Sequence, residues 1–149
     1  MSHKIQKKGR RRTIRPELIR EILDKHNIIA VVGASRNPEK YGHQVYRDLK
    51  EAGYKVYPVN PNADKILGDK AYPSLESLPE KPDVVNIVVP PRVTEKIVEQ
   101  CSRLGITRVW MQPGSESDRA IQYCEKNGIE VVHGVCIMIQ RKQHQQQGT

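Results

Sequence analysis

The chain has 149 residues, which fits one domain and is long enough to bury a core without disulfides or metals. Its hydrophobic residues (37%) include no apolar run of the roughly 18 residues that a membrane span needs, and no apolar segment of a secretory signal follows the basic N-terminus. Three cysteines without metal-like spacing are typical of a reducing compartment, so we expect a cytoplasmic location.

The formal net charge of +8 comes from the two ends of the chain. Residues 1–15 contain seven basic residues and no acid, and Arg141 and Lys142 add two further positive charges. The stretch 16–140 therefore carries a net charge of −1. The folded part of the chain is close to neutral, and the composition alone does not make it a nucleic-acid-binding domain.

The polar ends also predict the domain limits. We expect disordered tails over residues 1–13 and 141–149, which have almost nothing apolar to bury, and one folded domain over 14–140. The basic tail could neutralise the phosphates of a nucleic acid, but it has no aromatic residues for base stacking. A solubilising role is therefore favoured, and nucleic acid is not the expected partner.

Between the tails, helical and strand patterns alternate. Pro16 begins an amphipathic helix that extends to about Lys25. Five strands are then predicted, at residues 28–32, 54–59, 84–89, 107–111 and 129–132. Because helical patterns separate most of these strands, we predict an α/β fold with a parallel sheet. The specific prediction is a five-stranded, doubly wound (Rossmann-type) sheet in the order 3-2-1-4-5, with an extra N-terminal helix.

Ligands of doubly wound sheets bind at the carboxyl ends of the strands, which directs attention to the loop after the first strand. Gly33 ends the buried run of this strand, and Ser35 follows with a hydroxyl and an N–H group. A helix predicted from about Gly42 would present free N–H groups and the positive end of its dipole. Arg36 and Lys40 place two cations beside it. This pattern predicts an anion-binding, phosphate-type site.

The same segment argues against several nucleotide-binding classes. The loop lacks the second glycine of the dinucleotide fingerprint G-x-G-x-x-G, and no acid ends the second strand to hold a free ribose diol. The second strand instead runs into the sequence PVNP, which tolerates a phosphorylated ribose. There is also no Walker-type P-loop, so ATP hydrolysis of that type is not expected.

The motifs GASRNPEKYG, YPVNP and WMQPG occur together in the predicted site. In this combination, the chain from about Ile28 to Met138 resembles the CoA-binding domain of ADP-forming acyl-CoA synthetases and of the succinyl-CoA synthetase α subunit. It is most similar to the stand-alone CoA-binding proteins that consist of this domain only. The resemblance implies a Rossmann-type fold and coenzyme A as the ligand.

The resemblance also implies which parts of the chain would meet each part of CoA. The loop after the first strand would line the phosphates, and its two cations would neutralise the 3′-phosphate or the diphosphate. The loop after the second strand would lie beside the ribose, and the loop after the third strand would form the slot for the adenine. Gln112 and Cys136 would lie toward the pantetheine arm. The cofactor-binding residues are then Gly33, Ala34, Ser35, Arg36, Lys40, Asn60, Pro61, Val89, Pro90, Pro91, Gln112 and Cys136.

The sequence offers no catalytic constellation to accompany this site. We find no pair of acids in a shared pocket, no Ser-His-Asp arrangement and no metal cluster. The leading hypothesis is therefore a module that binds CoA or an acyl-CoA without catalytic activity of its own. Two alternatives stay open: a CoA-binding subunit of a split acyl-CoA synthetase, and a CoA- or nucleotide-sensing regulator that uses its basic tail on nucleic acid.

The three cysteines divide into two groups by position. Cys101 and Cys124 fall on the apolar stripes of their predicted helices and are expected in the core. Cys136 is the cysteine that lies near the predicted site. One hypothesis for it is a mixed disulfide with the CoA thiol, which requires exposure and thiolate character.

Overall fold

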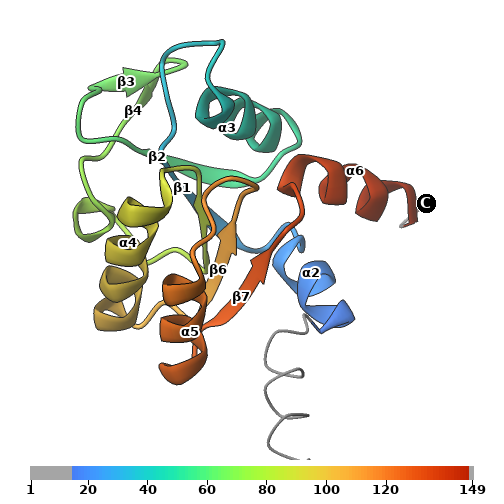
Figure 1. Ribbon diagram of the computed structural model, residues 1–149. Helices are drawn as coiled ribbons and strands as arrows, with labels where there is room; N and C mark the ends of the chain where they lie inside the picture. Colours follow the sequence, from blue (N-terminus) through green and yellow to red (C-terminus); the bar gives the residue numbers. More distant parts are fainter. Residues whose placement is uncertain (1–14, 148–149) are drawn as a thin grey trace, which may run out of the picture.

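The computed structural model describes residues 15–147, shown in Figure 1. The helices are α2 (Pro16–Ile22), α3 (Tyr41–Glu51), the 3-10 helix η1 (Leu75–Ser77), α4 (Pro91–Leu104), α5 (Asp118–Lys126) and α6 (Ile137–Gln147). The strands are β1 (Ile28–Val32), β2 (Lys55–Val59), β3 (Lys65–Ile66), β4 (Asp69–Lys70), β5 (Val84–Ile87), β6 (Arg108–Met111) and β7 (Glu130–His133). The predicted N-terminal helix and all five main strands are present.

The five main strands form one parallel sheet in the order β2-β1-β5-β6-β7, so the predicted α/β Rossmann-like fold is confirmed. The predicted strand order 3-2-1-4-5 is wrong. Counted along the chain, the main strands lie in the order 2-1-3-4-5, the other common arrangement of doubly wound sheets. The third main strand, β5, pairs with the inner side of β1 instead of the outer side of β2.

Pro58 explains why β2 occupies the edge. A proline has no N–H group to give to a second neighbouring strand, so within sheets it is confined to edges and bulges. On its outer side β2 pairs only with the single residue Tyr72 among the described residues. The Tyr72 N–H donates to the Pro58 carbonyl, and the Tyr72 carbonyl accepts from the Asn60 N–H, both at 2.9 Å. By contrast, all four residues of β5 are buried, as a central strand requires.

Helices cover both faces of the sheet (Figure 1). One layer consists of α2, α3 and α6, which pack with the odd-numbered side chains of β1, among them Ile29 and Val31. The other consists of α4, α5 and η1, which pack with the alternate side chains of β1, Ala30 and Val32. Trp110 on β6 is fully buried in the first layer, and its Nε1 donates to the Val135 carbonyl at 3.0 Å.

The expected C-terminal tail is wrong over residues 141–147, because these residues continue helix α6. Ile137 at the start of this helix is fully buried. Further along, Arg141 donates from Nε and Nη2 to the two carboxylate oxygens of Asp48 on α3, at 2.8 and 3.0 Å. This paired contact fixes a polar helix that has no apolar stripe of its own. The expected tail over residues 1–13, like residues 148–149, lies outside the described part of the chain.

Candidate functional site

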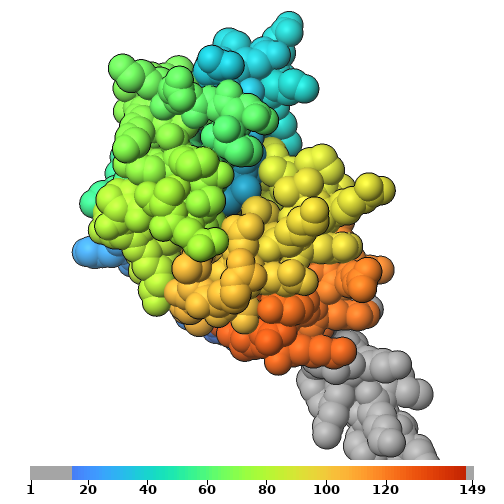
Figure 2. Space-filling model, turned by 90° about the vertical axis from the view of Figure 1, so that its left-hand side faces the viewer, coloured from blue at the N-terminus to red at the C-terminus, as the bar shows by residue number. Residues whose placement is uncertain are grey.

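The carboxyl ends of β1, β2 and β5 meet at one edge of the sheet, as the parallel order requires. The space-filling view in Figure 2 shows a hollow there, in which the blue surface at the end of β1 lies between the green segment that follows β2 and the yellow beginning of α4. Three of the predicted ligand-binding segments therefore border one depression.

Two glycines bring the start of α3 and the segment after β5 against the end of β1. Gly33 has φ +100°, and a Cβ there would lie 2.1 Å from the Val88 carbonyl oxygen and 2.9 Å from a methyl carbon of Val89. A Cβ on Gly42, in the first turn of α3, would lie 1.9 Å from the Gly33 carbonyl oxygen. A residue with a Cβ atom fits neither position, so the N-terminus of α3 packs directly against the end of β1.

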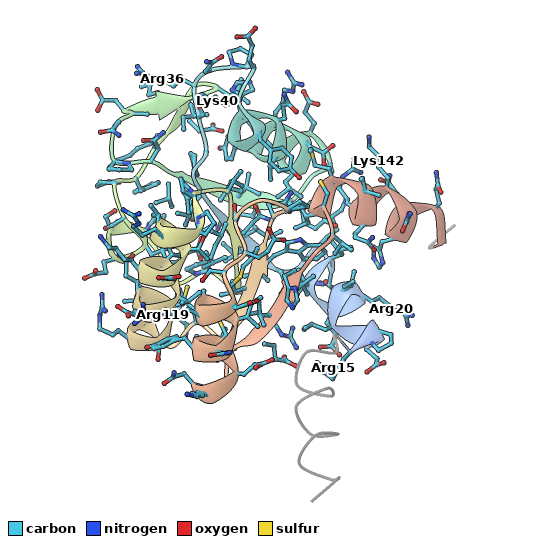
Figure 3. The ribbon with its side chains drawn as sticks, in the orientation of Figure 1. Arg15, Arg20, Arg36, Lys40, Arg119 and Lys142 are labelled. Carbon is cyan, nitrogen blue, oxygen red and sulfur yellow. The ribbon has the colours of Figure 1, made fainter. Side chains whose placement is uncertain are left out.

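The N-terminus of α3 is open toward this hollow. Its N-cap residue, Lys40, makes no side-chain capping hydrogen bond, and the first turn contains no acidic residue. The positive end of the helix dipole is therefore not neutralised by the helix's own side chains. Arg36 and Lys40 are exposed and lie together on the β1–α3 loop in Figure 3, far from Arg20 and Lys142 around α2 and α6.

The loop is held in place by the segment after β2. Asn60 donates from Nδ2 to the Ala34 carbonyl at 2.8 Å, which ties this segment to the loop, while Pro61 beside it is exposed. The Ser35 hydroxyl accepts from the Asn37 N–H at 3.1 Å, so its own hydrogen is left to donate elsewhere. The structure therefore brings the predicted phosphate and ribose residues together.

The residues of the predicted adenine slot lie on the other side of the hollow from the β1–α3 loop. Val89 is half-buried and packs toward the core layer of α4 and α5, and its side chain is close to Gly33. Pro90 is the N-cap of α4 and Pro91 its first residue, and both are exposed. An apolar surface thus faces the loop from across the strand end.

Gln112 and Cys136 form a second cluster, which Tyr41 joins to the first. Gln112 is fully buried and donates from Nε2 to the Tyr41 hydroxyl at 2.6 Å and to Cys136 Sγ at 3.3 Å. The Tyr41 hydroxyl in turn donates to Cys136 Sγ at 3.0 Å. The Gln112 Oε1 atom accepts from the Ile137 N–H at 3.0 Å and from Asn86 Nδ2 at 3.2 Å. Since Tyr41 is the first residue of α3, the same helix serves both clusters.

The surroundings of Cys136 affect its ionisation. Partial burial raises the pKa of the thiol, whereas hydrogen bonds from Tyr41 and Gln112 and from the backbone of Ile139 and Met138 lower it. The net result is a pKa below the ordinary value. Burial, followed by the contact with Cys136, raises the pKa of Tyr41 well above its usual range, so the phenol stays protonated and remains a donor.

A family model described as a CoA binding domain matches residues 27–142. The chain belongs to this family. The CoA-binding domain is 38% identical over 116 residues to the ADP-forming acetate–CoA ligase II of Archaeoglobus fulgidus, a match that covers 73% of the chain but only 17% of the ligase. It is 33% identical over 121 residues to the protein YneT of Bacillus subtilis, covering 81% of the chain and 90% of YneT.

A solved structure of similar length shares the fold. The hypothetical protein from Pyrococcus horikoshii OT3 aligns with a TM-score of 0.84 and 38% sequence identity, over 89% of this chain and 93% of that one. The CoA-binding domain thus corresponds over most of its length to small single proteins and spans only a small part of the large ligase.

Sequence reasoning missed three functional positions in this CoA-binding domain. It treated Gly42 only as the start of a helix, although a glycine in a first helical turn is a signal for close packing. It gave Tyr41 no role of its own and overlooked Asn86, because the importance of both depends on side-chain contacts across the sheet. His43, in the first turn of α3, is 4% exposed, and its Nδ1 lies 2.8 Å from the Ser35 carbonyl.

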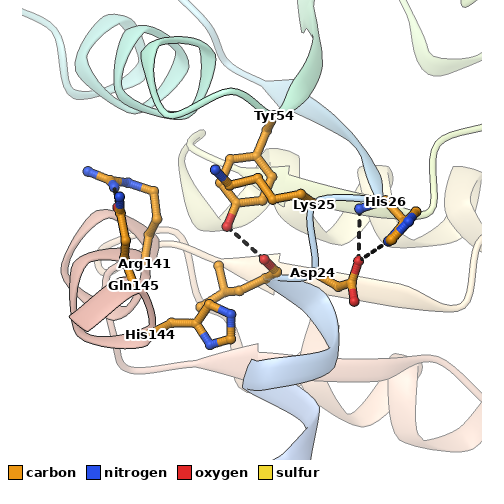
Figure 4. Close-up of a pocket in the computed structure, with 8 residues that line it drawn as sticks. Asp24, Lys25, His26, Tyr54, Arg141, His144 and Gln145 are labelled. Atoms are coloured by element: carbon orange, nitrogen blue, oxygen red, sulfur yellow. Dashed lines mark hydrogen bonds and ion pairs between the residues drawn. The ribbon is translucent and has the colours of Figure 1, made fainter. Parts of the chain in front are cut away.

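Other cavities of the CoA-binding domain lie away from this site. One of about 230 Å³ is lined by the end of α2, Tyr54 and α6 (Figure 4). Leu23 to His26 lead into β1 and Tyr54 precedes β2, so this cavity is at the amino edge of the sheet. Two of its polar contacts lie within the lining: the Tyr54 hydroxyl donates to the Leu23 carbonyl at 2.7 Å, and Asp24 pairs with His26. Among residues 15–147, no group of three potential ligands could hold a metal ion, and no helix could cross a membrane.

Proposed function

We propose that this chain binds CoA or an acyl-CoA through the loop of residues 33–41, without catalytic activity of its own. The observation that carries the proposal is the contact of Gly42 with Gly33, which places an uncapped helix N-terminus at the end of β1. Backbone N–H groups in such a place bind phosphates well. Arg36 and Lys40 add positive charge beside them, and membership of the CoA-binding family supports CoA as the matching ligand.

The remaining predicted residues then take the rest of the ligand. Asn60 and Pro61 border the hollow on the ribose side, and Val89, Pro90 and Pro91 offer an apolar surface to the adenine. Gln112 and Cys136 lie beyond Tyr41, on the side proposed for the pantetheine arm.

A role as one subunit of a split acyl-CoA synthetase is the second candidate, because the chain matches 17% of the length of an acetate–CoA ligase. Acyl-CoA formation that appears only after a partner chain is added would favour it. A regulator that acts on nucleic acid would use the basic tail, which lies outside the described residues. A mobility shift that depends on salt and changes with CoA would identify that function.

The proposal is tested by calorimetric titration of the full chain with CoA, with dephospho-CoA, NAD and ATP as comparison ligands. We expect CoA to bind best and removal of the 3′-phosphate to weaken binding. Lys40→Ala should lower the affinity about tenfold, the effect of losing one contact to a charged group. The matched control is Lys126→Ala, an exposed lysine at the end of α5, near the amino edge of the sheet.

Two results would contradict the proposal. One is preferential binding of NAD, or of none of the four ligands. The other is an equal loss of affinity in Lys40→Ala and Lys126→Ala, which would mean that the loop contributes only through net charge.

A further inference from the structure

Cys136 is held by donors that come from three different elements. Its Sγ accepts hydrogen bonds from the Tyr41 hydroxyl at the start of α3 and from Gln112 Nε2 just after β6. It also lies at the N-terminus of α6, where the backbone of Met138 and Ile139 provides further hydrogen bonds. Such donors favour a thiolate over a thiol. Cys136 as a whole residue is only half-buried, in contrast to the fully buried Cys101 and Cys124.

The same cluster contains a buried acceptor that nothing in the described chain satisfies. Asn86 on β5 is fully buried, and its Nδ2 donates to Gln112 Oε1, but its Oδ1 has no hydrogen-bond partner among residues 15–147. Asn86 is the register neighbour of Trp110, which lies in the layer of α2, α3 and α6. A buried amide oxygen without a donor is rare in native proteins and indicates a missing partner.

We propose that Cys136 is a nucleophile that captures the sulfur end of a pantetheine-type ligand by thiol–disulfide exchange, an inference that rests on the proposed CoA binding. The Cys136 thiolate attacks one sulfur of the symmetrical CoA disulfide. The new Sγ–S bond forms as the ligand's S–S bond breaks, and one CoA thiolate leaves and takes a proton from water. The disulfide is the oxidant, so no other co-reactant is needed.

Pantetheine carries an amide N–H two carbons from its sulfur. Asn86 is fully buried in the chain without ligand, so we expect the arm to displace the side chains that cover it and its N–H then to donate to Asn86 Oδ1. The cluster thus distinguishes a pantetheine disulfide from a simple one, while the phosphates of the same ligand are held at the start of α3. The other two cysteines do not compete with Cys136 for the disulfide, because burial raises the pKa of Cys101 and of Cys124 to about 12 and keeps both thiols protonated.

The test is intact-mass measurement of the reduced full chain during incubation with three disulfides. CoA disulfide has both the amide and the phosphates, pantethine has the amide alone, and diethyl disulfide has neither the phosphates nor any hydrogen-bond donor. We expect a single adduct on Cys136, which is one CoA, one pantetheine or one ethanethiol less two hydrogens. It should form fastest with CoA disulfide and slowest with diethyl disulfide. Cys136→Ser should give no adduct, whereas Cys101→Ala and Cys124→Ala should react as the unchanged chain does.

Two variants test the cluster itself. Tyr41→Phe removes one hydrogen bond to the thiolate, which corresponds to about one pKa unit. At a pH below both midpoints the thiolate fraction then falls about tenfold while each thiolate becomes more nucleophilic, so the reaction slows about threefold and the midpoint of its pH profile rises by about one unit. Asn86→Leu should lower the ratio of the pantethine rate to the diethyl disulfide rate, both measured in the same variant, to about one.

The outcomes separate this inference from the proposed function. Equal rates with pantethine and diethyl disulfide in the unchanged chain, or CoA binding without any Cys136 adduct, would overturn the inference alone. If pantethine reacts faster than diethyl disulfide but CoA disulfide has no further advantage and CoA gives no binding heat, the thiol site is supported and the phosphate-loop proposal fails.

Discussion

The contact between Gly42 and Gly33 can be tested by adding one methyl group. In Gly42→Ala the new Cβ would start 1.9 Å from the Gly33 carbonyl oxygen, and it must retreat by about 1 Å to reach the shortest distance that such contacts show. Helix propensity alone predicts that alanine stabilises this position by about 1 kcal/mol. Overpacking against backbone costs about 1–3 kcal/mol. We therefore expect the free energy of unfolding to fall by about 1 kcal/mol.

The same displacement moves the N-terminus of α3 away from the phosphates. Because an anion gains about 0.3–2 kcal/mol from a helix N-terminus, the affinity for CoA should fall by up to about thirtyfold. Urea unfolding and CoA titration measure the two effects. Arg47→Ala, at an exposed position of the same helix, is the control for propensity and should not weaken CoA binding. A Gly42→Ala chain as stable as the original, with the same CoA affinity, would refute the reasoning.

Two further predictions concern the C-terminal helix and the thiols. Arg141→Ala leaves the Asp48 carboxylate, which is 18% exposed, without its paired donors, so urea unfolding should show a free energy of unfolding lower by about 1.5–3 kcal/mol. The control Lys142→Ala, at an exposed position, should change this free energy little. Equal effects of the two variants would mean that α6 is not fixed by the Arg141–Asp48 pair. Iodoacetamide at pH 8 should label the native chain only at Cys136. The labelling rate should increase with pH, and the midpoint of this pH profile should lie below that of an ordinary thiol. Labelling of the two buried cysteines at a similar rate would contradict their burial.

The fold class could be predicted because its signals are local. Apolar runs, helical stripes and the breaks between them identify the βα units, and parallel pairing follows from their alternation. The strand order depends on where β5 adds to the sheet, and that information lies in Pro58. Its missing N–H excludes an interior position for β2, which the predicted order required. The polar sequence of α6 likewise gave no local signal, because Arg141 finds Asp48 93 residues away.

The candidate site likewise has one part that local sequence signals predict and one part that they do not. The loop of residues 33–41 was predictable from a strand end, a glycine, two cations and a helix start, all adjacent in the sequence. Asn86, Gln112 and Tyr41 come from three elements and acquire meaning only through hydrogen bonds across the sheet. Cys136 was predicted near the site from its place in the sequence, but the donors that favour its thiolate form belong to those distant elements.

Helix α3 links the two ends of the proposed ligand. Its backbone N-terminus, held by Gly42 on Gly33, faces the phosphate end, and the side chain of its first residue, Tyr41, reaches the thiol end at Cys136. A shift of this helix must therefore alter both contacts, because a packed helix moves as a unit. It follows that Gly42→Ala should slow the capture of CoA disulfide by more than it slows the capture of diethyl disulfide, since both ends of CoA depend on α3 and diethyl disulfide reaches only the thiol end.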